Sequence, residues 1–222
     1  MSDVTVIIPT YNASNYIEET LSSVYGQELP PKEIIVVDDG SSDNTANIVR
    51  QKHPKVKLLQ QENKGAYEAL NYGIKSARHD LIALLDHDDI WLSGKLRKQV
   101  ELMNMHPECQ MVFTLLENYM PNHLDGVELK QLNTPLMGIH KSTLMVRKHI
   151  FDSVGLFEKS KIELLEWYAK AIDKNIDQKF VNEVLVKRRI HGANQSLTDK
   201  SLRQEFPKII KAILDRRRNE KK

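Results

Sequence analysis

Cysteine is almost missing from this sequence. Cys109 is the only one in 222 residues, so the chain cannot form an intramolecular disulfide or a metal site made of several thiolates. Long apolar runs are missing too, because no window approaches the roughly 18 consecutive apolar residues of a membrane-spanning helix. The first residues, MSDVTVIIPTYN, contain neither a basic region nor an apolar run of signal-peptide length, so we expect a cytoplasmic protein.

An excess of one charge is also absent from most of the chain. The formal net charge of +2 is too small for the concentrated basic face of a nucleic-acid-binding protein. Positive charge gathers only in the tail Arg203–Lys222, which has eight Lys or Arg against three Asp or Glu. Hydrophobic residues make up 41% of the chain, which is enough for a sizeable core. The composition therefore indicates a globular protein with a basic tail and no nucleic-acid partner.

Apolar runs alternate with helical patterns along the first hundred residues. The runs expected to be strands are Val4–Ile8, Ile34–Val37, Val56–Leu59 and Leu81–Leu85, and the stretches expected to be helices are Ala13–Tyr25, Asp43–Lys52 and Gly65–Ala77. Continuous apolar strands separated by helices are typical of a parallel sheet that is covered on both faces. The sequence therefore predicts an α/β fold with a mainly parallel central sheet and helices on both faces.

The second half of the chain is less regular. Its expected elements are a helix from Gly94 to about Met105, strands at Met111–Leu116 and Thr143–Val146, a long connection over Asn118–Pro135, and helices at Glu163–Ile172 and Leu202–Leu214. The last helix has an apolar stripe and a basic end. It either packs on the body of the protein or makes a peripheral contact with an anionic membrane surface at its inner face.

Polar side chains directly follow three of the expected strands. The three clusters are Pro9-Thr10-Tyr11-Asn12, Asp38-Asp39-Gly40-Ser41 and Asp86-His87-Asp88-Asp89. Each cluster alone is also typical of a plain turn. In an open parallel sheet, however, ligands bind beyond the carboxyl ends of the strands, where all three clusters should meet. Three carboxylates within four residues repel one another, and a divalent cation with oxygen ligands would relieve that repulsion and bridge phosphate oxygens.

Four segments in this order resemble the family 2 glycosyltransferases of the GT-A fold. They read VIIPTYNASNYIEETLSSV, EIIVVDDGSSDNT, ENKGAYEALNYGIKSA and LIALLDHDD, and weaker patches continue to about residue 196. The resemblance implies a GT-A nucleotide-sugar-binding fold and an inverting, metal-dependent transfer with Mn2+ or Mg2+. The implied donor is a nucleoside-diphosphate sugar, with a UDP-sugar expected. The acceptor would be a saccharide or a lipid-linked molecule, as in bacterial surface polysaccharide or glycoconjugate synthesis.

We accordingly expect a single domain over residues 1–222. It would consist of a donor half (1–105), an acceptor half (106–200) and a basic C-terminal helix (201–222). The residues that the resemblance places at the donor are Pro9, Thr10, Tyr11, Asn12, Asp38, Asp39, Lys64 and Asn71. Among them, the Tyr11 ring would lie against the base or ribose. Lys64 would reach the base or a phosphate, or else lie in solvent, and Asn71 would contact the donor or else brace a loop.

The third cluster is the expected metal site. In the resemblance Asp88 is the principal metal ligand, Asp86 faces the ribose or the metal, and Asp89 supports them from behind. The late segment RRIHGANQS adds two candidates. His191 would complete the metal ligands or contact phosphate, and Arg189 would contact the diphosphate.

An inverting transfer needs a base on the acceptor side that removes the proton from the attacking hydroxyl. Glu163 and Glu166 are three residues apart in an expected helix, so they share one face and either is a candidate. Glu166 directly precedes Trp167, where the family more often has Asp. Otherwise both are exposed helix carboxylates. His140, in the segment GIHKST, lies where the family lines its sugar pocket, or else is a loop histidine.

Two other functions compete with this one. A nucleotidyltransferase would carry a glycine-rich basic segment near its N-terminus, and Pro9–Asn12 at that place has neither glycine nor lysine. A non-catalytic nucleotide-sugar-binding or regulatory protein on the same fold is compatible with the short acceptor half and with Glu in place of Asp. The candidates Asp86, Asp88, Glu166 and His191 favour an enzyme.

Overall fold

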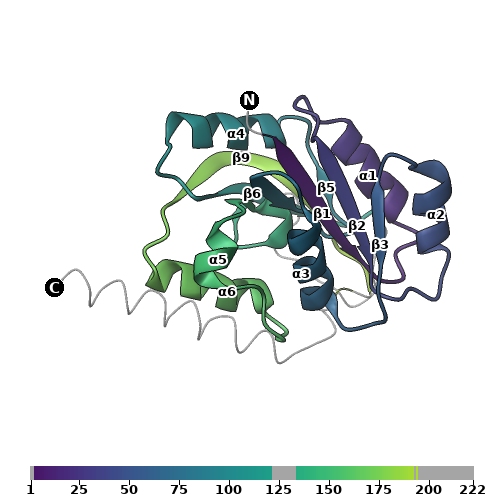
Figure 1. The fold of residues 1–222 in the computed structure, drawn as a ribbon. Helices are drawn as coiled ribbons and strands as arrows, with labels where there is room; N and C mark the ends of the chain where they lie inside the picture. The colour runs from purple at the N-terminus through teal and green to yellow at the C-terminus, as the bar shows by residue number, and fades with distance from the viewer. Residues whose placement is uncertain (1–2, 122–133, 193, 195–222) are drawn as a thin grey trace.

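One β-sheet with helices on both faces forms the core of the protein in the computed structural model, which describes residues 3–121, 134–192 and 194 (Figure 1). The strands are β1 (Val4–Thr10), β2 (Glu33–Asp38), β3 (Lys57–Gln60), β4 (Leu81–Leu84), β5 (Ile90–Trp91), β6 (Met111–Tyr119), β7 (Leu136–Met137), β8 (Met145–Arg147) and β9 (Gln178–Arg189). The helices are α1 (Ile17–Tyr25), α2 (Thr45–Lys52), α3 (Ala66–Ser76), α4 (Lys95–Met105), α5 (Ile150–Val154) and α6 (Glu163–Asp173), with a short 3-10 helix η1 (Lys141–Thr143). The predicted α/β class is confirmed.

Two predicted segments lie outside the described residues. They are the basic tail 201–222 with its expected helix, and residues 122–133 of the expected connection. Of the helices that the structure describes, none combines the length and the apolar character needed to cross a bilayer.

The sheet is parallel in its first half and mixed in its second. Its strand order is β3-β2-β1-β4-β8-β6-β9-β5, and β7 pairs with β6. The predicted parallel pairing holds for β3, β2, β1 and β4, which are joined through helices. The second half adds antiparallel pairs of β8 with β4 and with β6. Because β6 then runs parallel to β9, the carboxyl end of β9 lies at the same edge of the sheet as that of β4.

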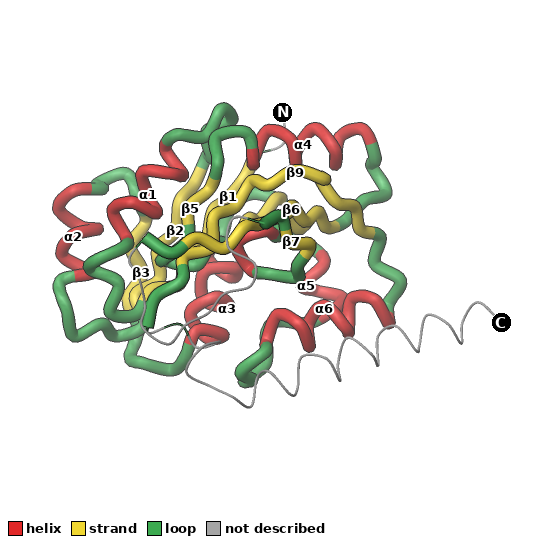
Figure 2. Tube along the Cα trace, turned by 180° about the vertical axis from the view of Figure 1, so that it is seen from behind, coloured by secondary structure: helices red, strands yellow, loops and turns green. Residues whose placement is uncertain are grey.

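Side chains of the central strands alternate between two cores. Ile7 and Ile35 pack with α3, α5 and α6 on one face, whereas Val6 and Val36 pack with α1, α2 and α4 on the other. Figures 1 and 2 show these two sets of helices from opposite directions. Because both faces are buried, the strands have no polar face, which explains their continuous apolar runs.

The strand register brings the three polar clusters together. Thr10 pairs with Asp38 between β1 and β2, and Ile7 pairs with Leu84 between β1 and β4. Residues 9–12, 38–41 and 86–89 therefore follow at one edge, as the sequence predicts. The antiparallel β8 begins at this same edge, so η1, which precedes it, lies beside the end of β4.

A buried amide ties α3 to the chain that follows α5. Asn71 is 6% exposed, and its Nδ2 donates to the Phe157 carbonyl at 2.8 Å. The Phe157 N–H donates back to Asn71 Oδ1 at 3.0 Å. The amide therefore joins two segments 86 residues apart, which is the bracing contact offered as the alternative to donor binding.

Replacing Asn71 with alanine should lower the free energy of unfolding by about 1–3 kcal/mol, because both backbone groups of buried Phe157 lose their partner. Urea unfolding measures the loss. The control is Asn47→Ala at an exposed position of α2, which should change stability by at most about 0.5 kcal/mol. Equal stability of the Asn71 variant and the wild type would contradict the brace.

A lysine is fully buried at the start of α4. Lys95 Nζ donates to Gln99 Oε1 at 2.8 Å and lies 3.9 Å from the centroid of the Trp91 ring. Burial lowers the pKa of Lys95 well below its usual value, because the charged form loses its hydration. The folded chain therefore binds this proton less tightly than the unfolded chain does.

This difference predicts a pH dependence of stability. Between the lowered pKa and the ordinary lysine pKa of about 10.4, the unfolded state holds more protons, so stability rises with pH. The wild type should therefore gain stability relative to Lys95→Met as the pH rises from 7 to 10, by at most about 1.4 kcal/mol per pH unit. Urea unfolding at several pH values tests this, with exposed Lys55→Met as the control. A difference between wild type and Lys95→Met that stays constant with pH would refute the expectation.

Candidate active site

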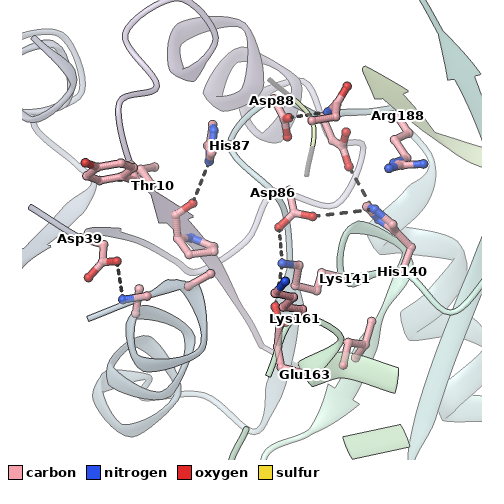
Figure 3. A pocket seen from close by; sticks show the side chains of 18 of the residues that line it. Thr10, Asp39, Asp86, His87, Asp88, His140, Lys141, Lys161, Glu163 and Arg188 are labelled. Atoms are coloured by element: carbon pink, nitrogen blue, oxygen red, sulfur yellow. Dashed lines mark hydrogen bonds and ion pairs between the residues drawn. The ribbon is translucent and has the colours of Figure 1, made fainter. Parts of the chain in front are cut away.

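A cavity of about 970 Å³ opens at the carboxyl edge of the sheet (Figure 3). Its volume lies at the upper end of the range for small-molecule sites. The predicted site residues that line it are Pro9, Thr10, Tyr11, Asn12, Asp39, Asp86, Asp88, Glu163 and His191. The predicted site residues that are not among its lining residues are Asp38, Lys64, Asn71, Glu166 and Arg189.

The end of β1 gives the cavity one wall. Tyr11 is 46% exposed there, so its ring is free to stack on a flat ligand. Asn12 has a positive φ of 49°, and its Oδ1 accepts a hydrogen bond from the Ser42 N–H at 2.9 Å. The Asn12 N–H donates to Ser41 Oγ at 2.9 Å. Asn12 therefore locks the loop after β1 to the loop after β2.

Asp39 lies at the end of β2 and fixes the loop that leads into α3. Its carboxylate accepts hydrogen bonds from the N–H groups of Lys64 and Gly65, each at 2.8 Å, and from Gln61 Nε2 at 2.7 Å. Gly65 has a φ of 98°, which few other residues adopt. Lys64 thus contacts Asp39 through its backbone N–H without lining the cavity, whereas Asp39 itself does line it.

Asp38 is buried beside the cavity without lining it. Its carboxylate accepts from the Ser41 N–H and from Gln60 Nε2, each at 3.3 Å. These contacts hold the turn after β2 and join it to β3. The two adjacent carboxylates therefore differ in what they contact: Asp39 lines the cavity and Asp38 does not.

The acidic cluster after β4 is held by three different sets of partners. Asp89 is 1% exposed, and its two oxygens accept from Ser142 Oγ at 2.5 Å and from the Arg189 N–H at 3.1 Å. Burial, together with the charges of Asp88 and Asp86, raises the pKa of Asp89 well above its usual value. Asp89 therefore packs behind the cluster and ties it to η1 and β9.

Asp88 faces the end of β9. Its Oδ2 lies 2.9 Å from His191 Nε2, and the His191 ring stacks on Tyr16 with 4.8 Å between centroids. Burial raises the pKa of Asp88, but the hydrogen bond with His191 and the neighbouring histidine charges outweigh it and bring the pKa to about 2. Asp88 is therefore a carboxylate at neutral pH.

Asp86 belongs to a second group that could hold a metal ion. Ligand atoms of Asp86, Asp89 and His140 lie within 4.8 Å of one another. Burial lowers the pKa of His140 to about 4, so its imidazole is neutral, which is the form that binds metals. Carboxylate oxygens with an imidazole nitrogen suit Mn2+, and the oxygens suit Mg2+. The predicted metal ligands thus fall into two adjacent groups. Asp88 pairs with His191, whereas Asp86 lies with Asp89 and with His140, which was not predicted as a metal ligand.

The two candidate bases on α6 differ in position. Glu163 lines the cavity, is 8% exposed, and lies 3.0 Å from Lys141 Nζ. Glu166 is half-buried and is not among the cavity-lining residues, although the spacing suggested one shared face. Trp167 is buried behind them and donates from Nε1 to the Gly155 carbonyl at 2.8 Å. Trp167 is one of several buried residues of α6, with Leu164, Leu165, Tyr168 and Ala171, and with this face buried Glu163 lines the cavity.

Arg189 lies beneath the acidic cluster. Its Nε donates to the Asp88 carbonyl at 2.9 Å, and its Nη2 pairs with Glu19 on α1. The guanidinium also lies 5.4 Å and 5.0 Å from the ring centroids of Tyr16 and Tyr119. The Arg189 side chain therefore stabilises the loop that carries the acidic cluster. Sequence reasoning missed Glu19 and Tyr16 because they are far from Arg189 along the chain.

Sequence reasoning also missed Lys141. This lysine lies in the segment 138–143 that the resemblance placed at the pocket, but His140 was the residue of that segment predicted to contact substrate. Lys141 Nζ lies 3.3 Å from Asp86 Oδ1 as well as 3.0 Å from Glu163 Oε1. Its contact with two acidic residues more than 20 positions away could not be read from the sequence.

Two curated proteins are similar to this chain in sequence. An uncharacterized glycosyltransferase of Rickettsia prowazekii (strain Madrid E) is 30% identical over 95% of this chain and 71% of its own length. The Escherichia coli UDP-Glc:alpha-D-GlcNAc-diphosphoundecaprenol beta-1,3-glucosyltransferase WfgD is 42% identical over 45% of this chain and 40% of its own.

Two solved structures have the same fold. Staphylococcus aureus TarS 1-349 in complex with UDP-GlcNAc matches 95% of this chain with a TM-score of 0.71 and 20% identity. The Pyrobaculum calidifontis mannosyltransferase PcManGT, in complex with GDP-Man and Mn2+, matches 87% with a TM-score of 0.67 and 21% identity. The chain spans 65% and 60% of these two solved chains, which is less than two thirds of each.

A sequence model of the family described as glycosyl transferase family 2 matches residues 5–155. The matched region contains β1 to β8, and with them all three polar clusters and η1. It is more than half of the chain, and it agrees with the relatives and with the fold. The chain belongs to the glycosyl transferase family 2.

Proposed function

We propose that this protein is a glycosyltransferase that moves a sugar from a nucleoside-diphosphate sugar to an acceptor hydroxyl. One observation supports this above all: a single cavity is lined by Tyr11 and Asp39, by the acidic cluster after β4, and by Glu163 from the second half of the chain. A stackable ring, a metal-binding cluster and a separate carboxylate are the groups that such a transfer needs.

A UDP-sugar is proposed as the donor. TarS has been solved with UDP-GlcNAc, and WfgD is named for its use of UDP-Glc. The acceptor is proposed to be a saccharide or a lipid-linked molecule, in the synthesis of a bacterial surface polysaccharide or glycoconjugate, because WfgD is named for a diphosphoundecaprenol-linked acceptor. In this proposal residues 1–105 bind the donor and residues 106–200 receive the acceptor.

The acidic cluster is proposed to hold one divalent cation, Mn2+ or Mg2+. Asp86 and Asp88 supply carboxylates, and His140 and His191 are the nitrogen donors beside them. The structure of PcManGT with Mn2+ supports this assignment. When bound, such an ion stabilises the negative charge of the departing diphosphate. Arg189 is proposed to position the cluster rather than to contact the donor, because its guanidinium contacts the Asp88 carbonyl and Glu19.

Glu163 is proposed as the catalytic base. The acceptor oxygen forms a bond to the anomeric carbon while the bond from that carbon to the diphosphate breaks, and the Glu163 carboxylate takes the proton of the acceptor hydroxyl. A single displacement of this kind inverts the configuration at the anomeric carbon. Glu163 is proposed over Glu166 because only Glu163 is among the residues that line the cavity.

A non-catalytic nucleotide-sugar-binding protein is the second candidate. The observation in its favour is the ion pair of Glu163 with Lys141 at 3.0 Å, because that contact occupies one oxygen of the candidate base. Incubation with a panel of nucleotide sugars and Mn2+ separates the two functions. An enzyme cleaves the nucleotide sugar and releases the nucleoside diphosphate with turnover. A binding protein shows saturable binding of the intact nucleotide sugar and releases no nucleoside diphosphate.

The metal assignment predicts that Asp88→Asn weakens Mn2+-dependent binding of UDP by about tenfold or more, because one charged oxygen ligand is lost. Isothermal titration calorimetry with and without Mn2+ measures the effect. Asp152→Asn, at an exposed position of α5, is the matched control and should bind as the wild type does. Unchanged Mn2+-dependent binding in Asp88→Asn would show that the metal is held elsewhere.

The base assignment predicts that Glu163→Gln lowers the rate of sugar transfer by about 10²-fold or more while UDP binding persists, since the amide cannot accept the proton. Glu166→Gln, one turn further along α6, is the matched control and should retain the rate. Steady-state assays with the best donor of the panel measure both variants. Loss in Glu166→Gln alone would transfer the role to that residue, and normal rates in both would remove α6 from the mechanism.

A further inference from the structure

Lys141 is a lysine in the wall of the cavity, between two acidic residues. Its Nζ lies 3.3 Å from Asp86 Oδ1 and 3.0 Å from Glu163 Oε1, and its side chain is 20% exposed. Figure 3 shows it between these two carboxylates. Asp86 belongs to the acidic cluster and Glu163 to α6, so Lys141 connects the acidic cluster with α6.

Lys141 and a divalent cation would use different oxygens of Asp86. Lys141 contacts Oδ1, whereas His140 Nε2 lies 3.8 Å from Oδ2. Figure 3 shows the two side chains approaching Asp86 from different sides. A metal ion near His140 would therefore leave the Lys141 pair in place, and the lysine would add a second positive charge beside the first.

The two residues that follow Lys141 anchor η1 to neighbouring elements. Ser142 Oγ donates to Asp89 Oδ2 at 2.5 Å, and the Ser142 carbonyl accepts from Trp91 Nε1 at 2.8 Å. Gln99 Nε2 donates to the Thr143 carbonyl at 2.9 Å. A short 3-10 helix with these ties presents its lysine in a fixed place, so little conformational entropy is lost when the lysine meets an anion.

We propose that Lys141 is a donor-binding residue that contacts the β-phosphate of the donor's diphosphate, next to the metal site at Asp86. This inference rests on the proposed function and adds a residue to it. Arg189, which the sequence suggested for the diphosphate, already contacts the Asp88 carbonyl and Glu19. A lysine ammonium is a compact charge that can approach phosphate while it keeps one carboxylate partner.

The test compares UDP with UMP, because only UDP has a β-phosphate. Calorimetry on the full chain with Mn2+ should show that Lys141→Met weakens UDP binding by about tenfold or more and changes UMP binding by at most about twofold. Lys141→Arg, which keeps the charge, should retain most of the UDP affinity. If the wild type prefers guanine, GDP and GMP replace the uridine nucleotides.

Two further variants separate a phosphate contact from a structural ion pair. Glu163→Gln should keep or raise UDP affinity, because it leaves the charge of Lys141 in place. If the ion pair only stabilised the fold of the site, Lys141→Met and Glu163→Gln would both lose UDP affinity. Lys170→Met is the matched control, since Lys170 pairs with Glu158 on the surface and is not among the cavity-lining residues. It should bind UDP as the wild type does.

Folding is checked by thermal unfolding of each variant. If Lys141→Met alone does not fold, the double variant Lys141→Met/Glu163→Gln, which leaves no unpaired charge at Glu163, is compared with Glu163→Gln and should show the same tenfold loss. Unchanged UDP affinity, or equal losses for UDP and UMP, overturns the inference and leaves the proposed function standing. A wild type that binds neither UDP nor GDP with Mn2+ overturns both.

Discussion

The carboxylates of Asp86, Asp88 and Asp89 are crowded into four residues, and they must be held together against their mutual repulsion. The structure gives each of them a different partner. Asp89 accepts hydrogen bonds in the interior from Ser142 and the Arg189 backbone, Asp88 meets His191, and Asp86 faces both His140 and Lys141. A divalent cation would complete this compensation, because all three aspartates line the cavity.

These partners come from the second half of the chain, and the mixed strand order of the sheet places them beside the cluster. Antiparallel β8 starts at the carboxyl end of β4, so η1 with Lys141 and Ser142 reaches the cluster directly. β9 ends at the same edge and brings Arg189 and His191. The first half of the chain therefore places the acidic cluster, and η1 and β9 of the second half supply its partners. A substitution that displaces either half is expected to alter the site.

The sequence predicts much of the first half because its signals are local. A buried parallel strand followed by polar residues indicates both an element and the edge where it ends, so the rim formed by Tyr11, Asp39 and Asp86 was predictable. The contacts that these side chains make with one another could not be predicted from the sequence. The choice between Glu163 and Glu166 depends on the rotation of α6, which follows from how its whole buried face packs in the core. The contacts of Arg189 with Glu19 and of Lys141 with Asp86 join residues far apart in the chain.

The central claim is that the acidic cluster binds a divalent cation together with a nucleoside diphosphate. Anomalous scattering at the manganese absorption edge, from crystals of the protein grown with UDP and Mn2+, tests it most directly. We expect one strong peak within coordination distance of Asp86 or Asp88, roughly 2.0–2.6 Å from a carboxylate oxygen, with UDP density running from that peak toward Tyr11. A peak at another place on the chain, or UDP bound in the cavity with no manganese beside the cluster, would contradict it.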